Sequence, residues 1–379
     1  RGGPPRPSGT RRASSIATSP TPPLPVRRIL SKSSITPPNA PTDTSRPPLS
    51  NVAPTAVLTP RRLLQPKSLK SGPISILDNA LRPLRNPDDV IGDEPTDFSV
   101  CGVIGTEAVG KSRIMSQVAR SMRSDQPEFL VHNGVSLANG APMTTGIDAL
   151  FIRGATSSIL LDSQPINSPA ILLSLMNSGI SPPHGYSSLG QLELFHTIEL
   201  SSLILSVSNL VLVVQDRFSD DSTLSTLSAG SMLKIAGGQQ LGFPNIYHHP
   251  RCIFVYTKVP MESFSEREWR RMHKHIRMTL DGQYFPDQKS PICNELLGLN
   301  LNSSGLDLFF VPDESCADIY NLCMDELGEL VTTLMKDAFV TGESYASWFR
   351  ATVRIWDEIR CSKANAMYNK VLSAQAIME

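Results

Sequence analysis

The residues best suited to chemistry stand close together near position 110. Gly105 ends an apolar run, and Gly110, Lys111 and Ser112 follow it after four intervening residues. Glycines at this spacing let the backbone turn so that successive N–H groups face one phosphate cluster. The lysine then reaches the β- and γ-phosphates, and the serine hydroxyl binds Mg²⁺. The pattern therefore predicts a phosphate-binding loop. Its residues are Gly105, Thr106, Glu107, Ala108, Val109, Gly110, Lys111 and Ser112.

The segments on either side position this loop. Residues 97–104 are mostly apolar, as in a buried strand, and residues 113–123 are compatible with a helix. A phosphate-binding loop of this kind connects a strand to a helix. The helix N-terminus then adds partial positive charge toward the phosphates. The alternative is a chance match in an irregular loop. We predict that the chain binds a purine nucleotide with Mg²⁺, or descends from a protein that did.

Two further residues are candidates for binding Mg²⁺ together with Ser112. Thr144 comes just before an expected strand, where P-loop GTPases place a hydroxyl that closes onto the metal. Asp162 ends the expected strand 157–162, the position of the metal-associated acid in P-loop nucleotidases. The alternatives are an ordinary loop threonine and a surface aspartate at a turn. We predict a metal site formed by Ser112, Thr144 and Asp162.

Two prolines stand where a GTPase usually has other residues. Pro165 replaces the glycine whose N–H contacts the γ-phosphate, and proline has no N–H to donate. We therefore expect triphosphate sensing to be impaired. After the strand 251–256, Lys258 lies where it would approach the base, but Pro260 stands in place of the acid that selects guanine. Lys258 is thus predicted to be close to the base, and the choice between guanine and adenine stays open.

The remaining elements predict the fold. Continuous apolar runs, rather than alternating ones, indicate a parallel sheet covered on both faces. The expected strands are 97–104, 146–152, 157–162, 210–215, 251–256 and 306–311, and the expected crossover helices include 191–202, 219–236, 262–280 and 319–338. We predict an α/β, P-loop G-domain-like, doubly wound and mostly parallel sheet flanked by helices. Its ligand site should lie at the carboxyl ends of the strands.

Composition divides the chain into three parts. Residues 1–90 hold 18 of the 31 prolines, and residues 1–80 carry 12 Lys and Arg against 2 Asp and Glu. This basic Pro/Ser-rich head is predicted to be disordered. Since it has no aromatic residues on which bases could stack, direct contact with RNA is not expected. Residues 91–340 form the expected G-like domain, and 341–379 an amphipathic C-terminal helix over 345–370 that packs on the domain or on a partner.

Several other classes of protein are disfavoured. The six cysteines contain no C-x-x-C spacing and suggest a reduced, cytoplasmic protein. The longest apolar stretch, 200–214, is interrupted by serines and is too short to span a membrane, so no membrane partner is expected. Because the chain begins with an arginine, we expect the natural protein to extend further back. His248, His249, His273 and His275 are assigned to surface or core rather than to metal binding.

The motifs resemble those of the dynamin-related GTPases of the atlastin and guanylate-binding type. The resemblance rests on 105–112, on 144–147 (Thr-Thr-Gly-Ile) and on 160–164 (Leu-Leu-Asp-Ser-Gln). It implies that Thr144 is the switch threonine and Asp162 the Mg²⁺-associated acid. Those enzymes carry an arginine inside the phosphate loop, whereas this loop has a glutamate, Glu107, and no cation before Lys111.

A closer resemblance covers residues 95–372 and is to the Smg-nine family. Its motifs are 162–169 (Asp-Ser-Gln-Pro-Ile-Asn-Ser-Pro), 214–218 (Val-Gln-Asp-Arg-Phe), Trp348-Phe349 and 354–357 (Arg-Ile-Trp-Asp). The family implies a subunit of the nonsense-mediated mRNA decay kinase complex. By this resemblance the chain heterodimerises with the Smg-eight G-like subunit and binds and restrains the Smg-one kinase. We expect a regulatory protein with little or no hydrolysis, in which the nucleotide is a structural ligand or a slow switch.

Two other functions remain open from the sequence. An active dynamin-like GTPase, stimulated by dimerisation, would need an arginine supplied by its partner; the loop sequence, Pro165 and Pro260 count against it. An ATP-dependent small-molecule kinase would need an arginine-rich lid over the phosphates. The arginine-dense segment 267–277 instead falls in an expected side helix.

Overall fold

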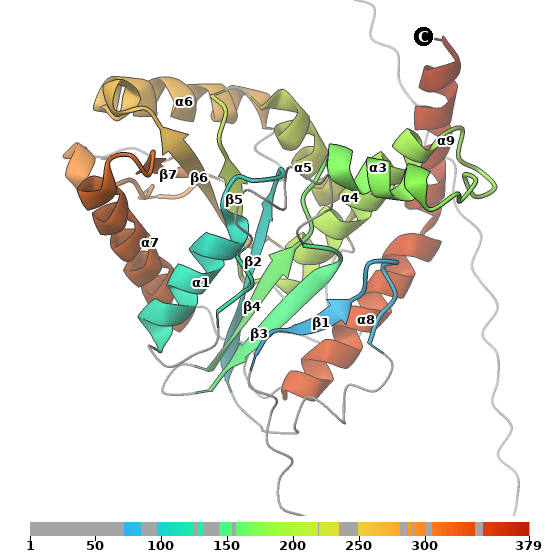
Figure 1. The fold of residues 1–379 in the computed structure, drawn as a ribbon, viewed down its shortest axis with the longest axis horizontal. Coiled ribbons are helices and arrows are strands. Elements are labelled where there is room, and N and C mark those ends of the chain that lie inside the picture. The colour runs from blue at the N-terminus through green and yellow to red at the C-terminus, as the bar shows by residue number, and fades with distance from the viewer. Residues whose placement is uncertain are drawn as a thin grey trace, which may run out of the picture. The chain divides into compact units, whose positions relative to one another are not determined.

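A seven-stranded sheet forms the centre of the protein. The computed structural model describes residues 72–84, 97–123, 128–131, 144–153, 157–218, 220–234, 249–280, 285, 287–289, 291–299, 305–337 and 344–378. The strands are β1 Ile74–Leu77, β2 Phe98–Gly105, β3 Ile147–Ile152, β4 Ser157–Ser163, β5 Leu210–Gln215, β6 Arg251–Val259 and β7 Asp307–Pro312. Their order across the sheet is β1-β3-β4-β2-β5-β6-β7 (Figure 1).

The sheet is mixed but mostly parallel. Strands β4, β2, β5, β6 and β7 pair in parallel, whereas β3 pairs antiparallel with both β4 and β1. The central residues of the parallel strands are mostly apolar and buried because helices cover both faces of the sheet. The expected α/β fold with a mostly parallel sheet is confirmed. All five parallel strands end at one edge, and the loop after β2 lies there.

Helices divide into two groups, one on each face of the sheet. They are α1 Lys111–Met122, α3 Pro169–Asn177, α4 Leu189–Val207, α5 Asp221–Leu233, α6 Glu266–Thr279, α7 Ala317–Asp337, α8 Tyr345–Cys361 and α9 Lys363–Met378. Short 3-10 turns, η2 Met261–Ser263 and η3 Glu295–Leu297, join some of them. Helices α1 and α7 pack side by side on one face, and α4, α5, α6 and α8 share the core on the other face (Figure 1).

Strand β1 corrects the expected extent of the head. It lies inside residues 1–90, which the composition assigned to disorder, yet it pairs with β3 and buries Ile76 and Leu77. Gly146 has φ 70°, and a Cβ there would lie 2.0 Å from the Leu77 carbonyl oxygen, so the close approach of β1 requires glycine. A four-residue strand is too short to alter the average composition of a proline-rich stretch. The structure describes residues 72–84 of this stretch.

The C-terminal segment forms two helices rather than the single helix expected over 345–370. The backbone becomes extended at Ser362, between α8 and α9. Helix α8 turns its apolar side toward the sheet: the Tyr345 hydroxyl donates to the Ile152 carbonyl (2.8 Å) and the Trp356 indole donates to the Leu81 carbonyl (3.1 Å). Residues from the two ends of the described chain thus meet at the β1 edge of the sheet. No helix in the described part of the chain is long and apolar enough to cross a membrane.

Candidate functional site

The loop between β2 and α1 has the backbone shape of a phosphate cradle. Ala108 and Gly110 have φ of 59° and 93°, in the left-handed region, and helix α1 begins directly after Gly110. The Gly110 position caps α1 without a side-chain hydrogen bond, so its first N–H groups face outward from the helix end. Gly105 packs tightly against β5, where an added Cβ would lie 2.2 Å from the Val214 carbonyl oxygen. The predicted loop residues therefore adopt one compact turn at the carboxyl edge of the sheet.

Lys111 is the buried cation of this loop. Its side chain is 7% exposed, and its Nζ donates to the carbonyls of Gly105 (3.0 Å) and Thr106 (2.8 Å). Burial lowers the Lys111 pKa to about 8, while Asp162 and Glu107 act in the opposite direction. A buried ammonium held by neutral carbonyls is available for a stronger, anionic partner. The loop thus holds a cation where the sequence predicted one.

Asp162 and Ser112 meet beside Lys111. The Ser112 hydroxyl donates to Asp162 Oδ2 at 2.7 Å, and Asp162 Oδ1 is buried without a hydrogen-bond partner in the structure as described. Burial raises the Asp162 pKa to about 6, against the effects of Ser112, Lys111 and Thr144. The structure therefore brings together the three predicted metal ligands. Two hydroxyls and a carboxylate with an unsatisfied oxygen form a hard oxygen set that suits Mg²⁺.

The segment after Asp162 is tied back to the protein rather than open to a phosphate. Gln164 N donates to the Gly146 carbonyl (2.8 Å), and Ile166 N donates to the Gly105 carbonyl (3.1 Å). Pro165 lies between them and has no N–H. All three residues are buried, or nearly so. The backbone from 164 to 166 consequently has no free donor to offer a terminal phosphate.

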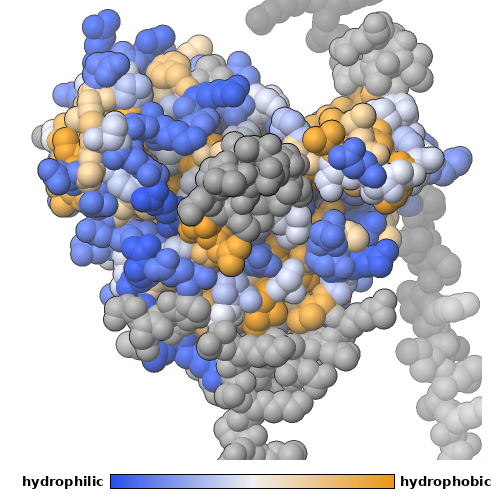
Figure 2. All heavy atoms as spheres, in the orientation of Figure 1, coloured by the Kyte–Doolittle hydropathy of each residue, from blue (hydrophilic) through white to orange (hydrophobic). Residues whose placement is uncertain are grey.

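Glu107 connects the phosphate loop to helix α3. Its carboxylate accepts a hydrogen bond from the Ser168 hydroxyl (2.9 Å), and the same hydroxyl caps α3 by accepting from Ile171 N (3.3 Å). Helix α3 itself carries exposed apolar side chains among polar ones (Figure 2): Leu173 and Met176 are 45% and 59% exposed. One side chain therefore links the loop to this helix.

Lys258 occupies a strained position at the end of β6. It has φ 55°, which is unusual for a residue other than glycine, and it lies where the pairing of β6 with β7 shifts register. Its Nζ pairs with Asp216 at 3.1 Å. The preceding Thr257 donates to the carbonyl of Val109 in the phosphate loop (2.9 Å). The chain thus fastens this loop to β6 and holds Lys258 at the rim of a small cavity.

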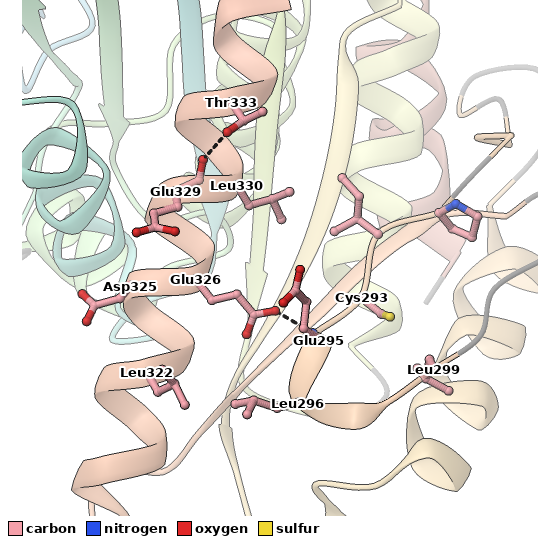
Figure 3. A pocket seen from close by; sticks show the side chains of 12 residues that line it. Cys293, Glu295, Leu296, Leu299, Leu322, Asp325, Glu326, Glu329, Leu330 and Thr333 are labelled. Atoms are coloured by element: carbon pink, nitrogen blue, oxygen red, sulfur yellow. Dashed lines mark hydrogen bonds between the residues drawn. The ribbon is translucent and has the colours of Figure 1, made fainter.

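Three cavities differ in their suitability for phosphate. One of about 80 Å³ lies between the phosphate loop, Lys258 and the start of α7, and one of about 300 Å³ lies on the other side of the loop, beside Glu107, Asp216 and Asp220. A larger hollow of about 880 Å³ separates η3 from α7 (Figure 3). It is lined by Pro291, Ile292, Cys293, Glu295, Leu296, Leu299, Leu322, Asp325, Glu326, Glu329, Leu330 and Thr333. Four carboxylates and no cation in this lining disfavour an anionic ligand.

Some features of the site were not predicted from the sequence. The Glu107–Ser168 contact and the role of Thr257 were missed, although a threonine directly before a strand-ending lysine was a usable signal. Arg113, Glu314 and Tyr320 were missed as well, because Arg113 comes from α1 and the other two from a segment about 200 residues further along the chain. Among the residues that the structure describes, no group of three or more His, Cys, Asp or Glu side chains is placed to hold a metal ion. His273 accepts from Leu306 N (3.0 Å) and stacks on Trp269, and His248 lies outside the described residues.

No family model matches the chain. It is 25% identical over 353 residues to the nonsense-mediated mRNA decay factor SMG9 of Xenopus laevis, a match that covers 82% of this chain and 69% of that protein. The protein of the same name from Salmo salar is 24% identical over 357 residues, covering 83% and 70%. The one from Caenorhabditis briggsae is 28% identical over 280 residues, covering 67% and 70%.

Among solved structures, a bacterial selenocysteine-specific elongation factor, EF-Sec, is similar at low level. It has a TM-score of 0.31 and 11% sequence identity, covering 62% of this chain and 29% of that one.

Proposed function

Because the chain is a homologue of vertebrate proteins named nonsense-mediated mRNA decay factor SMG9, we propose that it acts in nonsense-mediated mRNA decay as a nucleotide-holding regulatory subunit. We propose further that it heterodimerises with a Smg-eight G-like subunit and binds and restrains the Smg-one kinase. The names of these similar proteins support the pathway, and the partners follow from the resemblance to the Smg-nine family.

One observation carries the nucleotide part of this proposal. Lys111, Ser112 and Asp162 are packed together at the carboxyl edge of a mostly parallel sheet, on a loop with the backbone of a phosphate cradle. In this proposal a purine nucleotide lies along the loop, and its phosphates draw the Lys111 ammonium away from the Gly105 and Thr106 carbonyls. Ser112, Thr144 and Asp162 would hold Mg²⁺, which would neutralise part of the phosphate charge.

The same surroundings argue against efficient hydrolysis. The loop contributes the Glu107 carboxylate where related GTPases contribute an arginine, and Ser168 holds that carboxylate in place. Pro165 and the bonded N–H groups beside it leave the terminal phosphate without a backbone donor. Arginine fingers contribute roughly 10³ to 10⁵ in rate, so their absence from the loop is a large loss. The competing function, an active GTPase stimulated by dimerisation, would require a partner to supply this arginine.

A nucleotide that is held but not hydrolysed stabilises the fold by mass action. At a nucleotide concentration 100 times Kd the gain is about 2.7 kcal/mol. The Glu107–Ser168 contact would extend this stabilisation to α3, whose exposed apolar side chains would be covered by a protein partner. In this account the bound nucleotide stabilises the surface at α3 through which the chain would bind its partner subunit.

The proposal is tested with the purified full-length chain. Its thermal transition is measured with Mg-ATP, Mg-GTP and Mg²⁺ alone, and any nucleotide released on denaturation is identified by chromatography. A rise of the transition with one or both triphosphates is expected. Co-purification with Smg-eight and Smg-one homologues tests the partners, and a turnover assay with those partners present tests the competing GTPase. Phosphate release that rises steeply with the partner would favour that alternative.

A further inference from the structure

The strand order decides on which side of the phosphate loop a base must lie. Asp162, the acid of the metal set, is the penultimate residue of β4, and β4 lies on one side of β2. A nucleotide whose phosphates meet Mg²⁺ on the β4 side extends across β2 toward β5, β6 and β7. Two cavities lie beside the loop. The one of about 300 Å³ is lined on this side only by residues that follow β5, whereas the one of about 80 Å³ reaches β6 and β7, between the phosphate loop, Lys258 and the start of α7. The base of the proposed nucleotide should therefore enter this cavity.

That cavity is too small for a purine nucleoside as it stands. Binding sites for small molecules usually measure roughly 300 to 1,000 Å³, against about 80 Å³ here. The floor is buried and fixed, because Val109 and Ile114 are 1% and 2% exposed. Only the outer wall has room to move.

An ion pair forms this outer wall. Arg113, in the first turn of α1, pairs with Glu314, in the segment between β7 and α7, and both side chains line the cavity. The Arg113 guanidinium carbon also lies 5.0 Å from the centre of the Tyr320 ring in α7. The two side chains are 43% and 62% exposed, so the pair lies in solvent and can part without disturbing the core.

We propose that Arg113 and Glu314 form a latch on the base cavity, so that phosphate binding and base binding are separable events at this site. The phosphates bind to a preformed loop. The base enters only when Arg113 separates from Glu314 and moves away from the Tyr320 ring. This inference rests on the proposed nucleotide binding.

The test compares two probes in isothermal titrations at fixed ionic strength. Inorganic tripolyphosphate with Mg²⁺ reports the phosphate loop alone, and Mg-ATP and Mg-GTP report loop and base cavity together. The readout is the ratio of the tripolyphosphate Kd to the nucleotide Kd. General charge effects act on both probes alike and cancel in this ratio: loss of a cation weakens both, and loss of an anion strengthens both.

Arg113→Ala and Glu314→Ala remove opposite charges but open the same latch. Both should raise the ratio, by up to about fivefold, which is the upper range for an exposed ion pair. The double variant should show the ratio of either single variant, because the pair can be broken only once. Arg120→Ala is the matched control: it removes another exposed pair of α1, with Glu128, that does not line the cavity. Its ratio should stay at the wild-type value.

The outcomes separate the latch from the proposed function. If the ratio stays unchanged in both variants, or moves in opposite directions in the two, the latch is wrong while nucleotide binding stands. If the wild-type chain binds neither tripolyphosphate nor nucleotide, both proposals are overturned.

Discussion

The two halves of the candidate site are built differently. In the phosphate half, Lys111 and Asp162 are buried, and neighbouring main-chain and hydroxyl groups fix them within 3.0 Å. In the base half, Arg113, Lys258 and Glu314 are joined by ion pairs at the surface. Buried polar groups that lose a partner cost far more than exposed ones do. In the proposed function, phosphate binding would therefore depend on buried groups of the fold, whereas base selection would depend on exposed side chains whose replacement costs little stability.

The largest effect should come from the centre of the phosphate half. Lys111→Ala removes the ammonium that would meet the β- and γ-phosphates, and we expect nucleotide affinity to fall at least about 100-fold, since charged hydrogen bonds contribute about 1.5 to 3 kcal/mol each. Lys258→Ala is the control from the base half and should cost less than about fivefold, as its pair with Asp216 is exposed. Nucleotide affinity is measured by calorimetry. Equal losses of affinity in the two variants would contradict the difference between the two halves of the site.

The pH dependence of binding should follow Lys111. Its pKa in the folded chain is lowered to about 8, so above pH 8 the free protein must take up a proton before it can bind phosphate. Affinity should therefore fall as pH rises through 8, by about tenfold per unit. Stability without nucleotide should move the other way and rise between about pH 8 and 10.5, because there the unfolded chain holds the proton that the folded chain has lost. A flat affinity between pH 7 and 9.5 would contradict the role of Lys111.

Asp162→Asn should separate stability from metal binding. Burial raises the Asp162 pKa from 3.8 to about 6, so the folded state loses stability as pH rises through this window, by up to about 3 kcal/mol. We expect the variant to unfold at higher denaturant than the wild type at pH 7.5, and at the same concentration below pH 4. It should also lose the Mg²⁺ dependence of nucleotide affinity, roughly tenfold. A variant that is less stable at pH 7.5 would contradict this reading of the buried carboxylate.

A smaller effect on nucleotide affinity is expected from residues 164–166, which lack a backbone donor for the terminal phosphate. Pro165→Ala restores an N–H between two residues whose own N–H groups are already bonded. The ratio of diphosphate to triphosphate Kd should rise several-fold, within the range of one hydrogen bond to a charged group. Ser163→Ala, a neighbouring substitution that changes no backbone donor, serves as the control. If the ratio is unchanged in Pro165→Ala, the missing N–H does not account for the loss of sensing.

Much of the phosphate half was predictable from sequence because its residues are close along the chain. Gly105 to Ser112 form one turn, and Asp162 lies near the end of an apolar strand that must run beside β2. The base half was not predictable, since Arg113, Lys258 and Glu314 come from three segments whose meeting depends on tertiary packing. Strand β1 was missed for another reason: its four residues pair with β3, and Leu81 after them binds Trp356, and both partners are distant in sequence. The residue types of so short a strand do not indicate which distant residues stabilise it.

The most direct measurement of the central claim is a single-turnover experiment. The purified chain is loaded with Mg-ATP or Mg-GTP labelled at the γ-phosphate, and both bound triphosphate and released phosphate are followed over hours, with Lys111→Ala in parallel. The account predicts saturable binding of at least one triphosphate, which stays intact on the wild-type chain, and no binding to the variant. Release of one phosphate per site within minutes, or equal binding to the variant, would contradict it.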